Sequence, residues 1–91
     1  MVATARHILV AEKELCEKLK KMIVKGEDFA KVASKHSVCP SGKEGGDLGS
    51  FVPGEMVPEF DEVVFKEEVG TVHGPIKTDF GYHLIQIMSR S

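Results

Sequence analysis

Two histidines lie within short apolar runs of the sequence, where an imidazole needs a specific partner. His7 belongs to RHILV at residues 6–10, and His83 belongs to YHLIQIM at residues 82–88. Both runs favour β-strands, and neighbouring strands would bring the two rings together across a sheet. A buried neutral imidazole has one nitrogen that donates and one that accepts, so two histidines can satisfy each other. The pattern predicts either a hydrogen-bonded structural pair, which is the simpler interpretation, or a site element that tunes a nearby group.

Cys39 is a candidate nucleophile, because a thiol beside a base or a helix dipole becomes reactive. By itself, such a cysteine is more often a packed thiol. His36 and Cys39 have an HxxC spacing, but a zinc site needs a recognisable ligand set that the sequence lacks, so we expect no metal. Cys16 lies in a helical pattern and is expected to pack as a small hydrophobe.

The stretch GGDLGSFVPGEMVPEF, residues 45–60, combines chain-bending residues with large apolar ones. Leu48, Phe51, Met56 and Phe60 either fill a core or line a pocket for an apolar group. Core packing is the simpler interpretation of such residues. The glycines of GKEGGDLG lack the Gly-Lys-Ser/Thr end of a phosphate-binding loop, so we interpret them as backbone turns.

The elements that must position these residues are predicted from the spacing of apolar residues and from the residues that begin or end helices and strands. We expect strands over residues 5–10, 48–52 and 82–88, and helices over about 12–25, from Asp28 onward and from Pro58 onward. Gly70 and Gly74-Pro75 are expected to break the chain, with a turn near Thr78–Gly81. His7 and Leu9 should share one face of their strand, and His83, Ile85 and Ile87 one face of theirs. The order β-α-α-β-α-β-β predicts an α+β domain with a small, mostly antiparallel sheet.

Length and charge narrow the function classes. The 91 residues fit one domain, 1–91, and the formal net charge of −2 argues against a nucleic-acid binder. No apolar run is long enough to span a membrane, and the N-terminal apolar run is too short for a signal peptide. We therefore expect a cytoplasmic protein that does not bind membranes, as a monomer.

Taken together, the motifs resemble the parvulin family of peptidyl-prolyl cis/trans isomerases, over essentially the whole chain. The resemblance rests on five segments: RHILV, DFAKVASKHS (28–37), CPSGKEGGDLGSF (39–51), MVPEFDEVVF (56–65) and GPIKTDFGYHLI (74–85). The chain looks most like the small stand-alone bacterial parvulins. The resemblance implies a parvulin-like (FKBP-like) fold, with a four-stranded antiparallel sheet surrounded by about three to four helices.

The resemblance also implies a site. His7 and His83 match the paired strand histidines of the family, and Cys39 matches a position that holds Cys or Asp, so these three are the expected catalytic residues. The residues that match the substrate-binding pocket for a proline ring are Leu48, Met56 and Phe60. Phe80 occupies a turn position that is often Ser or Thr in phosphate-reading members, and here it adds an apolar wall. Val57 replaces a residue that is polar in several relatives.

The implied activity is rotation about Xaa–Pro bonds of unfolded or flexible polypeptides, by non-covalent catalysis without cofactor or metal. Phospho-specific parvulins carry a basic cluster after the first strand. Here Lys13 is flanked by Glu12 and Glu14, so we expect no phospho-dependence. The expected partners are proline-containing segments and unfolded proteins. Two other functions stay open: a non-catalytic peptide-binding or chaperone module, and a thiol or redox domain centred on Cys39.

Overall fold

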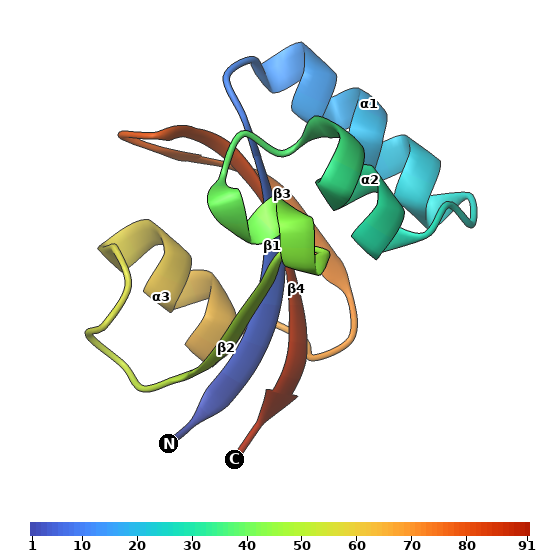
Figure 1. Ribbon diagram of the computed structural model, residues 1–91. Coiled ribbons are helices and arrows are strands. Elements are labelled where there is room, and N and C mark those ends of the chain that lie inside the picture. Colours follow the sequence, from blue (N-terminus) through green and yellow to red (C-terminus); the bar gives the residue numbers. More distant parts are fainter.

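The computed structural model describes residues 1–91 and contains one antiparallel sheet of four strands in the order β2-β1-β4-β3 (Figure 1). The elements along the chain are β1 (Ala3–Val10), α1 (Lys13–Val24), α2 (Phe29–His36), the 3-10 turn η1 (Pro40–Glu44), β2 (Asp47–Phe51), α3 (Pro58–Lys66), β3 (Val72–Thr78) and β4 (Gly81–Arg90). The predicted α+β class and the predicted order are confirmed. None of the helices combines the length and apolar character that crossing a membrane requires.

The two most apolar strands, β1 and β4, form the middle of the sheet. Their pairing is antiparallel, with Leu9 opposite His83 and His7 opposite Ile85. Side chains alternate between the faces, so Ile8, Val10 and Leu84 enter one core, whereas Ala5 and Ile85 enter another. The predictions that His7 shares a strand face with Leu9, and that His83 shares one with Ile85, are confirmed.

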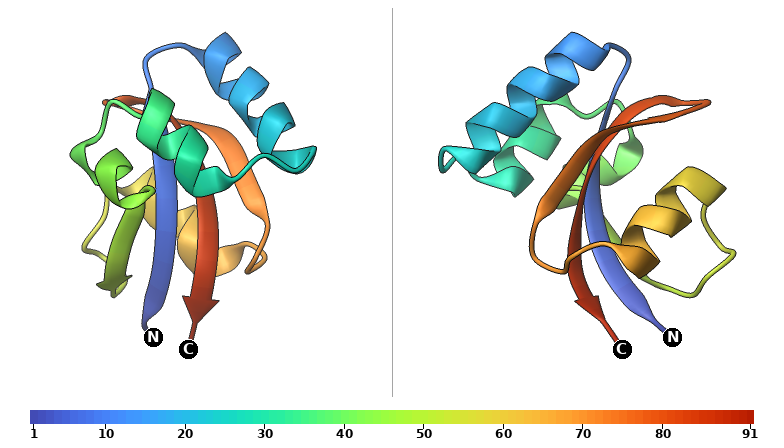
Figure 2. Two further views of the ribbon diagram at one scale, coloured as in Figure 1. Left: turned by 45° about the vertical axis from the view of Figure 1, so that its right-hand side comes forward. Right: turned by 180° about the vertical axis from the view of Figure 1, so that it is seen from behind.

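The helices form two layers on opposite faces of the sheet, and the layers are offset along the strands (Figure 2). On one face, α1 and α2 pack against the end of β1 that holds Ile8 and Val10. On the other face, α3 packs against Ala3 and Ala5 at the opposite end of β1. Each layer therefore covers only part of its face, and the remaining part of each face stays open.

The helix boundaries follow the capping signals in the sequence. The side chain of Asp28 accepts a hydrogen bond from the backbone N–H of Ala30 and so caps α2 as predicted. Pro58 occupies the first turn of α3, where its missing N–H costs nothing. Cys16 is fully buried in the α1 core, and burial raises its pKa to about 11, as fits the packing role expected for it.

One expectation about chain breaks is wrong. Gly74 and Pro75 do not interrupt the structure but lie inside β3. The strand accommodates them because β3 is at the edge of the sheet, where the missing N–H of proline is tolerated. The register of β3 against β4 shifts between His73 and Ile76, which is where these two residues sit.

Candidate functional site

The two strand histidines form a buried pair. The Nδ1 atoms of His7 and His83 lie 3.0 Å apart, and both rings are almost fully buried. The pair bridges β1 and β4 diagonally, because His83 is opposite Leu9 rather than opposite His7. A 3.0 Å contact between two ring nitrogens is a hydrogen bond in which one nitrogen carries the proton and the other accepts it.

Two hydroxyl groups extend the pair into a chain of hydrogen bonds. Nε2 of His83 lies 2.7 Å from the Thr78 hydroxyl, and Nε2 of His7 lies 3.2 Å from the Ser41 hydroxyl. The Ser41 hydroxyl in turn donates to the sulfur of Cys39 at 3.2 Å, and the backbone N–H of Phe80 donates to Thr78 Oγ1. The chain thus connects the β3–β4 turn to Cys39 through both imidazoles.

The donor capacities of these groups give the chain a direction. Ser41 has a single hydroxyl proton, which it donates to Cys39, so it must accept from Nε2–H of His7. Nδ1 of neutral His7 is then an acceptor, and the proton of the pair belongs to Nδ1 of His83. Nε2 of His83 accepts from the Thr78 hydroxyl. Every donor in this arrangement points toward the sulfur.

Burial keeps both imidazoles neutral at pH 7. Burial, followed by the charge of the neighbouring His83, lowers the pKa of His7 to about 4. Burial also lowers the pKa of His83, although the charge of Glu59 opposes that shift. The ring of Phe60 packs edge-on against both imidazoles, with centroid distances of 5.7 Å to His7 and 5.9 Å to His83. This apolar cover is what makes the charged forms costly.

The loop that carries Cys39 is held against β1 by backbone hydrogen bonds. The N–H of His7 donates to the carbonyl of Gly46, and the N–H of Val38 donates to the carbonyl of Leu9. Gly46 approaches β1 so closely that a Cβ atom on it would lie 2.2 Å from the His7 carbonyl oxygen, and its φ is +87°. Only glycine fits there, and this contact fixes the distance between the loop and the histidines.

An apolar cavity of about 390 Å³ opens above this hydrogen-bonded chain. All seven site residues predicted from the sequence line it: His7, Cys39, Leu48, Met56, Phe60, Phe80 and His83. Val57 lines it as well, together with three residues that the sequence analysis did not select, Leu9, Val38 and Pro40. Phe51, which the resemblance does not assign to the pocket, is buried in the core.

The lining residues divide into a cup and a rim. Phe60 is buried and Leu48, Met56 and Val57 are half-buried, so these four form the inner cup. Val38 and Phe80 are about two-thirds exposed and come from two different loops, where they form an apolar rim. Exposed apolar side chains gain free energy when a ligand buries them, and such surfaces commonly mark binding sites.

Sequence reasoning missed Ser41 and Thr78. Each is an ordinary turn residue by local pattern, and nothing around it marks it as functional. The signal that was available is indirect: a buried histidine pair satisfies only two of its four ring nitrogens, so two further hydroxyl or carbonyl partners must exist. Thr78 is five residues before His83 and Ser41 is two residues after Cys39, which makes both reasonable candidates.

The arrangement suits the binding of an apolar group beside a polarised chain of hydrogen bonds more than it suits bond-making chemistry. The cavity offers a water-poor cup of a size to hold a small ring, and beside it the sulfur of Cys39 and the polarised hydrogen-bonded chain. Three or more His, Cys, Asp or Glu side chains do not gather anywhere in a manner that would hold a metal ion.

Comparison with known proteins gives consistent results. The family model described as the PPIC-type PPIase domain (rotamase) matches residues 5–89. The foldase protein PrsA of Geobacillus sp. (strain WCH70) is 48% identical over 87 residues, which are 94% of this chain and 32% of that protein. The chain therefore spans about one third of the length of this curated relative.

Two solved structures extend the comparison. The crystal structure of PrsA from Bacillus subtilis has a TM-score of 0.93 and 40% identity, and the match covers 98% of this chain and 35% of that one. The solution structure of NmPin, the parvulin of Nitrosopumilus maritimus, has a TM-score of 0.87 and 37% identity. That match covers 97% of this chain and 96% of NmPin, so a relative of this domain's size exists.

Proposed function

The chain belongs to the PPIC-type (parvulin) family of peptidyl-prolyl cis/trans isomerases, and we propose that its reaction takes place in the cavity between β1, β4 and α3. One observation carries this proposal: the apolar cup, which includes Leu48, Met56 and Phe60, adjoins a buried histidine pair that is linked to Cys39. The proline ring occupies the cup, and the carbonyl that precedes it turns above Cys39.

The energetics require no bond to be made. Uncatalysed rotation takes about 10–100 s, and bringing it to milliseconds needs a gain of about 10⁴–10⁵, or about 5–7 kcal/mol. The twisted amide has lost its resonance and is less polar than the planar one. A water-poor cup therefore favours the twisted form over the ground state, and the grip on the ring adds to this preference.

We assign Cys39 an electrostatic or hydrogen-bonding role rather than a covalent one. Its sulfur already accepts a hydrogen bond from the Ser41 hydroxyl, at the end of a chain of donors that all point toward it. The imidazoles are neutral and buried, so they orient this chain and do not act as a strong base toward the thiol. His7 and His83 thus hold the network, while the cup binds the substrate.

The substrate preference follows from the rim. Val38 and Phe80 form apolar surfaces beside the cup, which favours an apolar residue next to the proline. Only Ala11 and Glu12 separate β1 from α1, so this connection has no room for a basic, phosphate-binding loop. We therefore predict that phosphorylating a residue before proline does not improve turnover, which a matched pair of Ser-Pro and phosphoserine-Pro peptides measures directly.

NMR exchange spectroscopy on short Xaa–Pro peptides tests the activity. We expect faster cis/trans exchange with catalytic amounts of the protein, and loss of most of that acceleration in Met56→Ala. Val24→Ala, which truncates an exposed apolar side chain at the far end of α1, is the control and should match the original protein. No acceleration, with resonances of Leu48 and Phe60 shifted by the peptide, would instead identify a non-catalytic peptide-binding module.

Cys39→Asp separates the electrostatic role from thiol chemistry. An aspartate retains a polar acceptor at the turning carbonyl but no sulfur, so partial acceleration is expected to remain. Complete loss in Cys39→Asp, with a folded protein and bound peptide, would support a covalent or redox role instead. Cys39→Ala supplies the baseline without any acceptor.

We further propose that residues 1–91 make up a single parvulin-type domain, which the match over residues 5–89 and the single sheet support. Binding of unfolded proteins, as the name foldase of the PrsA relatives suggests, is part of the same proposal. The monomeric state and the cytoplasmic location stay predictions from the sequence. Light scattering of the purified chain and fractionation of the source cells measure them.

A further inference from the structure

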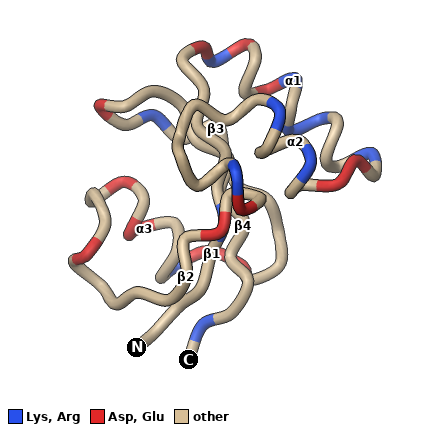
Figure 3. Tube along the Cα trace, viewed as in Figure 1, with Lys and Arg blue, Asp and Glu red and all other residues tan.

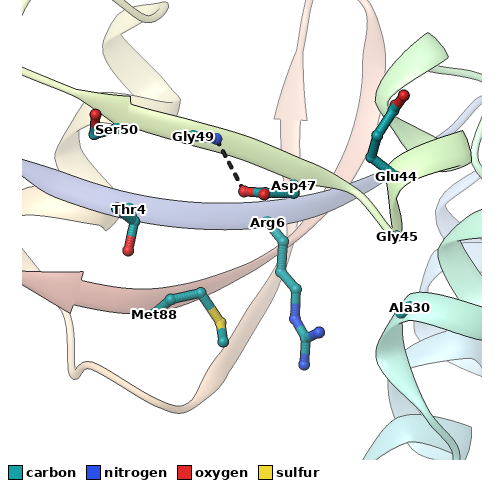
Figure 4. A pocket seen from close by; sticks show the side chains of 9 residues that line it. All are labelled: Thr4, Arg6, Ala30, Glu44, Gly45, Asp47, Gly49, Ser50 and Met88. Carbon is teal, nitrogen blue, oxygen red and sulfur yellow. Dashed lines mark hydrogen bonds between the residues drawn. The ribbon is translucent and has the colours of Figure 1, made fainter.

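The offset between the helical layers leaves a second hollow, on the face of the sheet opposite His7 and His83. It has a volume of about 500 Å³, and its walls come from β1, η1, β2, β4 and the start of α2 (Figure 4). We call it the Arg6 hollow and define it by Thr4, Arg6, Ala30, Glu44, Asp47 and Ser50. Five of its nine lining residues are polar or charged, whereas most of the residues that line the cavity on the other face are hydrophobic.

The side chain of Arg6 is fixed in this hollow by two contacts. Its Nε–H donates to the side-chain oxygen of Gln86 at 2.7 Å, and Gln86 in turn donates to the carbonyl of Gly70 at 3.0 Å. The guanidinium carbon lies 4.6 Å from the centroid of the Phe29 ring, which holds the planar group by a cation–π contact. Much of the entropy that an arginine loses on binding has therefore been lost already.

The outer two nitrogens of Arg6 have no partner within the protein. Only its Nε takes part in a hydrogen bond, and no carboxylate lies within 4.0 Å of the group, since the one ion pair of the molecule joins Lys66 to Glu62. Asp47 turns its carboxylate to the backbone N–H of Gly49 at 2.9 Å. Figure 4 shows the guanidinium extending into the hollow, on the side away from Asp47.

We propose that the Arg6 hollow binds a carboxylate carried by an acidic residue of a polypeptide segment. The two free nitrogens present parallel N–H donors, which match the two oxygens of a planar carboxylate. Glu44 and Asp47 border the same hollow, so a doubly charged phosphate would be repelled more strongly than a singly charged carboxylate.

A polypeptide suits the rest of the hollow. Its volume falls within the range of about 300–1,000 Å³ found for sites that enclose several groups of a ligand, so a lone carboxylate would leave most of it unfilled. The Ser50 hydroxyl forms no hydrogen bond within the protein, and the Thr4 hydroxyl keeps acceptor capacity beside its 2.6 Å bond to Ser89, so both offer partners to the amide groups that flank an acidic side chain. The site lies outside the catalytic cavity and does not depend on the proposed isomerase function.

Titration of the ¹⁵N-labelled protein by NMR tests the proposal with three probes: acetyl-Ala-Glu-Ala-amide, its Gln counterpart, and acetate. We expect the Glu peptide to shift the Arg6 Nε–H signal and the amides of Ala30 and Gly49 saturably. The Gln peptide should bind at least about fivefold more weakly because it lacks the charge, and acetate should also bind more weakly because it lacks the flanking amides.

Two variants make the test specific. Arg6→Lys retains the charge but not the two parallel N–H donors of the guanidinium, and should weaken binding of the Glu peptide about fivefold or more. Glu44→Gln removes a repulsive charge from an exposed side chain that forms no hydrogen bond, and should strengthen it. Equal binding of the Glu and Gln peptides, equal binding of acetate, or unchanged affinity in both variants would each overturn the proposal.

Discussion

Acidification should destabilise this domain chiefly through His7. Both ring nitrogens of His7 are occupied in the fold, since Nδ1 accepts from His83 and Nε2 donates to Ser41. A proton can reach Nδ1 only if the bond between the histidines breaks, and the charged ring would then be buried beneath Phe60. Burial, followed by the charge of His83, accordingly lowers the pKa of His7 from 6.5 to about 4.

The sign and size of the effect follow from these two pKa values. Between pH 6.5 and pH 4 the unfolded chain binds a proton at His7 that the folded protein does not, so stability rises with pH across this window. The contribution is fully present above pH 6.5 and is lost as pH falls toward 4. Each pH unit is worth about 1.4 kcal/mol, which gives about 3 kcal/mol between pH 7 and pH 4. That is a large part of the roughly 5–15 kcal/mol that stabilises a typical domain.

Urea unfolding at pH 7 and at pH 4, followed by circular dichroism, measures this difference. The pKa of His83 is also lowered, so it adds to the loss with the same sign. In His7→Gln the change in unfolding free energy between the two pH values should shrink by about 3 kcal/mol. His36→Gln is the control, because the ring of His36 is half-exposed and forms no hydrogen bond within the protein. An undiminished pH dependence in His7→Gln, or a His7 ring that titrates near its ordinary pKa by NMR, would refute the reasoning.

Two further substitutions probe the parts that position the site. Thr78→Val removes the hydroxyl that lies 2.7 Å from His83 Nε2, and should cost about 1–3 kcal/mol of stability while lowering kcat for prolyl exchange more than it raises KM. Thr78→Ser should restore both, and a Val variant with full kcat would separate the hydrogen-bonded chain from catalysis. Gly46→Ala forces a Cβ to within 2.2 Å of the His7 carbonyl, so its unfolding midpoint should fall well below that of Gly54→Ala, which has open space and bears only the backbone cost of about 1–2 kcal/mol. Equal midpoints would show that the loop moves away from β1 without penalty.

The sequence was informative wherever a local rule and the tertiary structure agree. The period-two pattern around His7 and His83 predicted the faces of two strands, and the structure places these strands side by side in the middle of the sheet. Once the strands were neighbours, the meeting of the two imidazoles required no further information. Asp28 and Pro58 marked helix starts for purely local reasons, which is why those boundaries were predictable.

Prediction failed where the outcome depends on position within the fold. Gly74 and Pro75 carry a strong local signal for a chain break, but an edge strand with an irregular register removes the penalty on which that signal depends. Ser41 and Thr78 carry no local signal, and they matter because the folded chain brings them to the two outer nitrogens of the histidine pair. The composition of the cup came from the family resemblance, since apolar residues near glycines are equally consistent with a core.

Arg6 and His7 are neighbours on β1, and they show that the offset between the two helical layers, rather than local sequence pattern, decides where a site can lie. Adjacent residues of β1 point to opposite faces of the sheet, so a single strand lines both the apolar cavity and the Arg6 hollow. The offset leaves part of each face of the sheet uncovered by helices, and both openings lie against the two central strands. Figure 3 shows the same trace with its charged residues. A chain that wraps around the edge strand β2 could therefore contact the two openings at once, which a peptide with an acidic residue and a distant proline would reveal as binding tighter than either half alone.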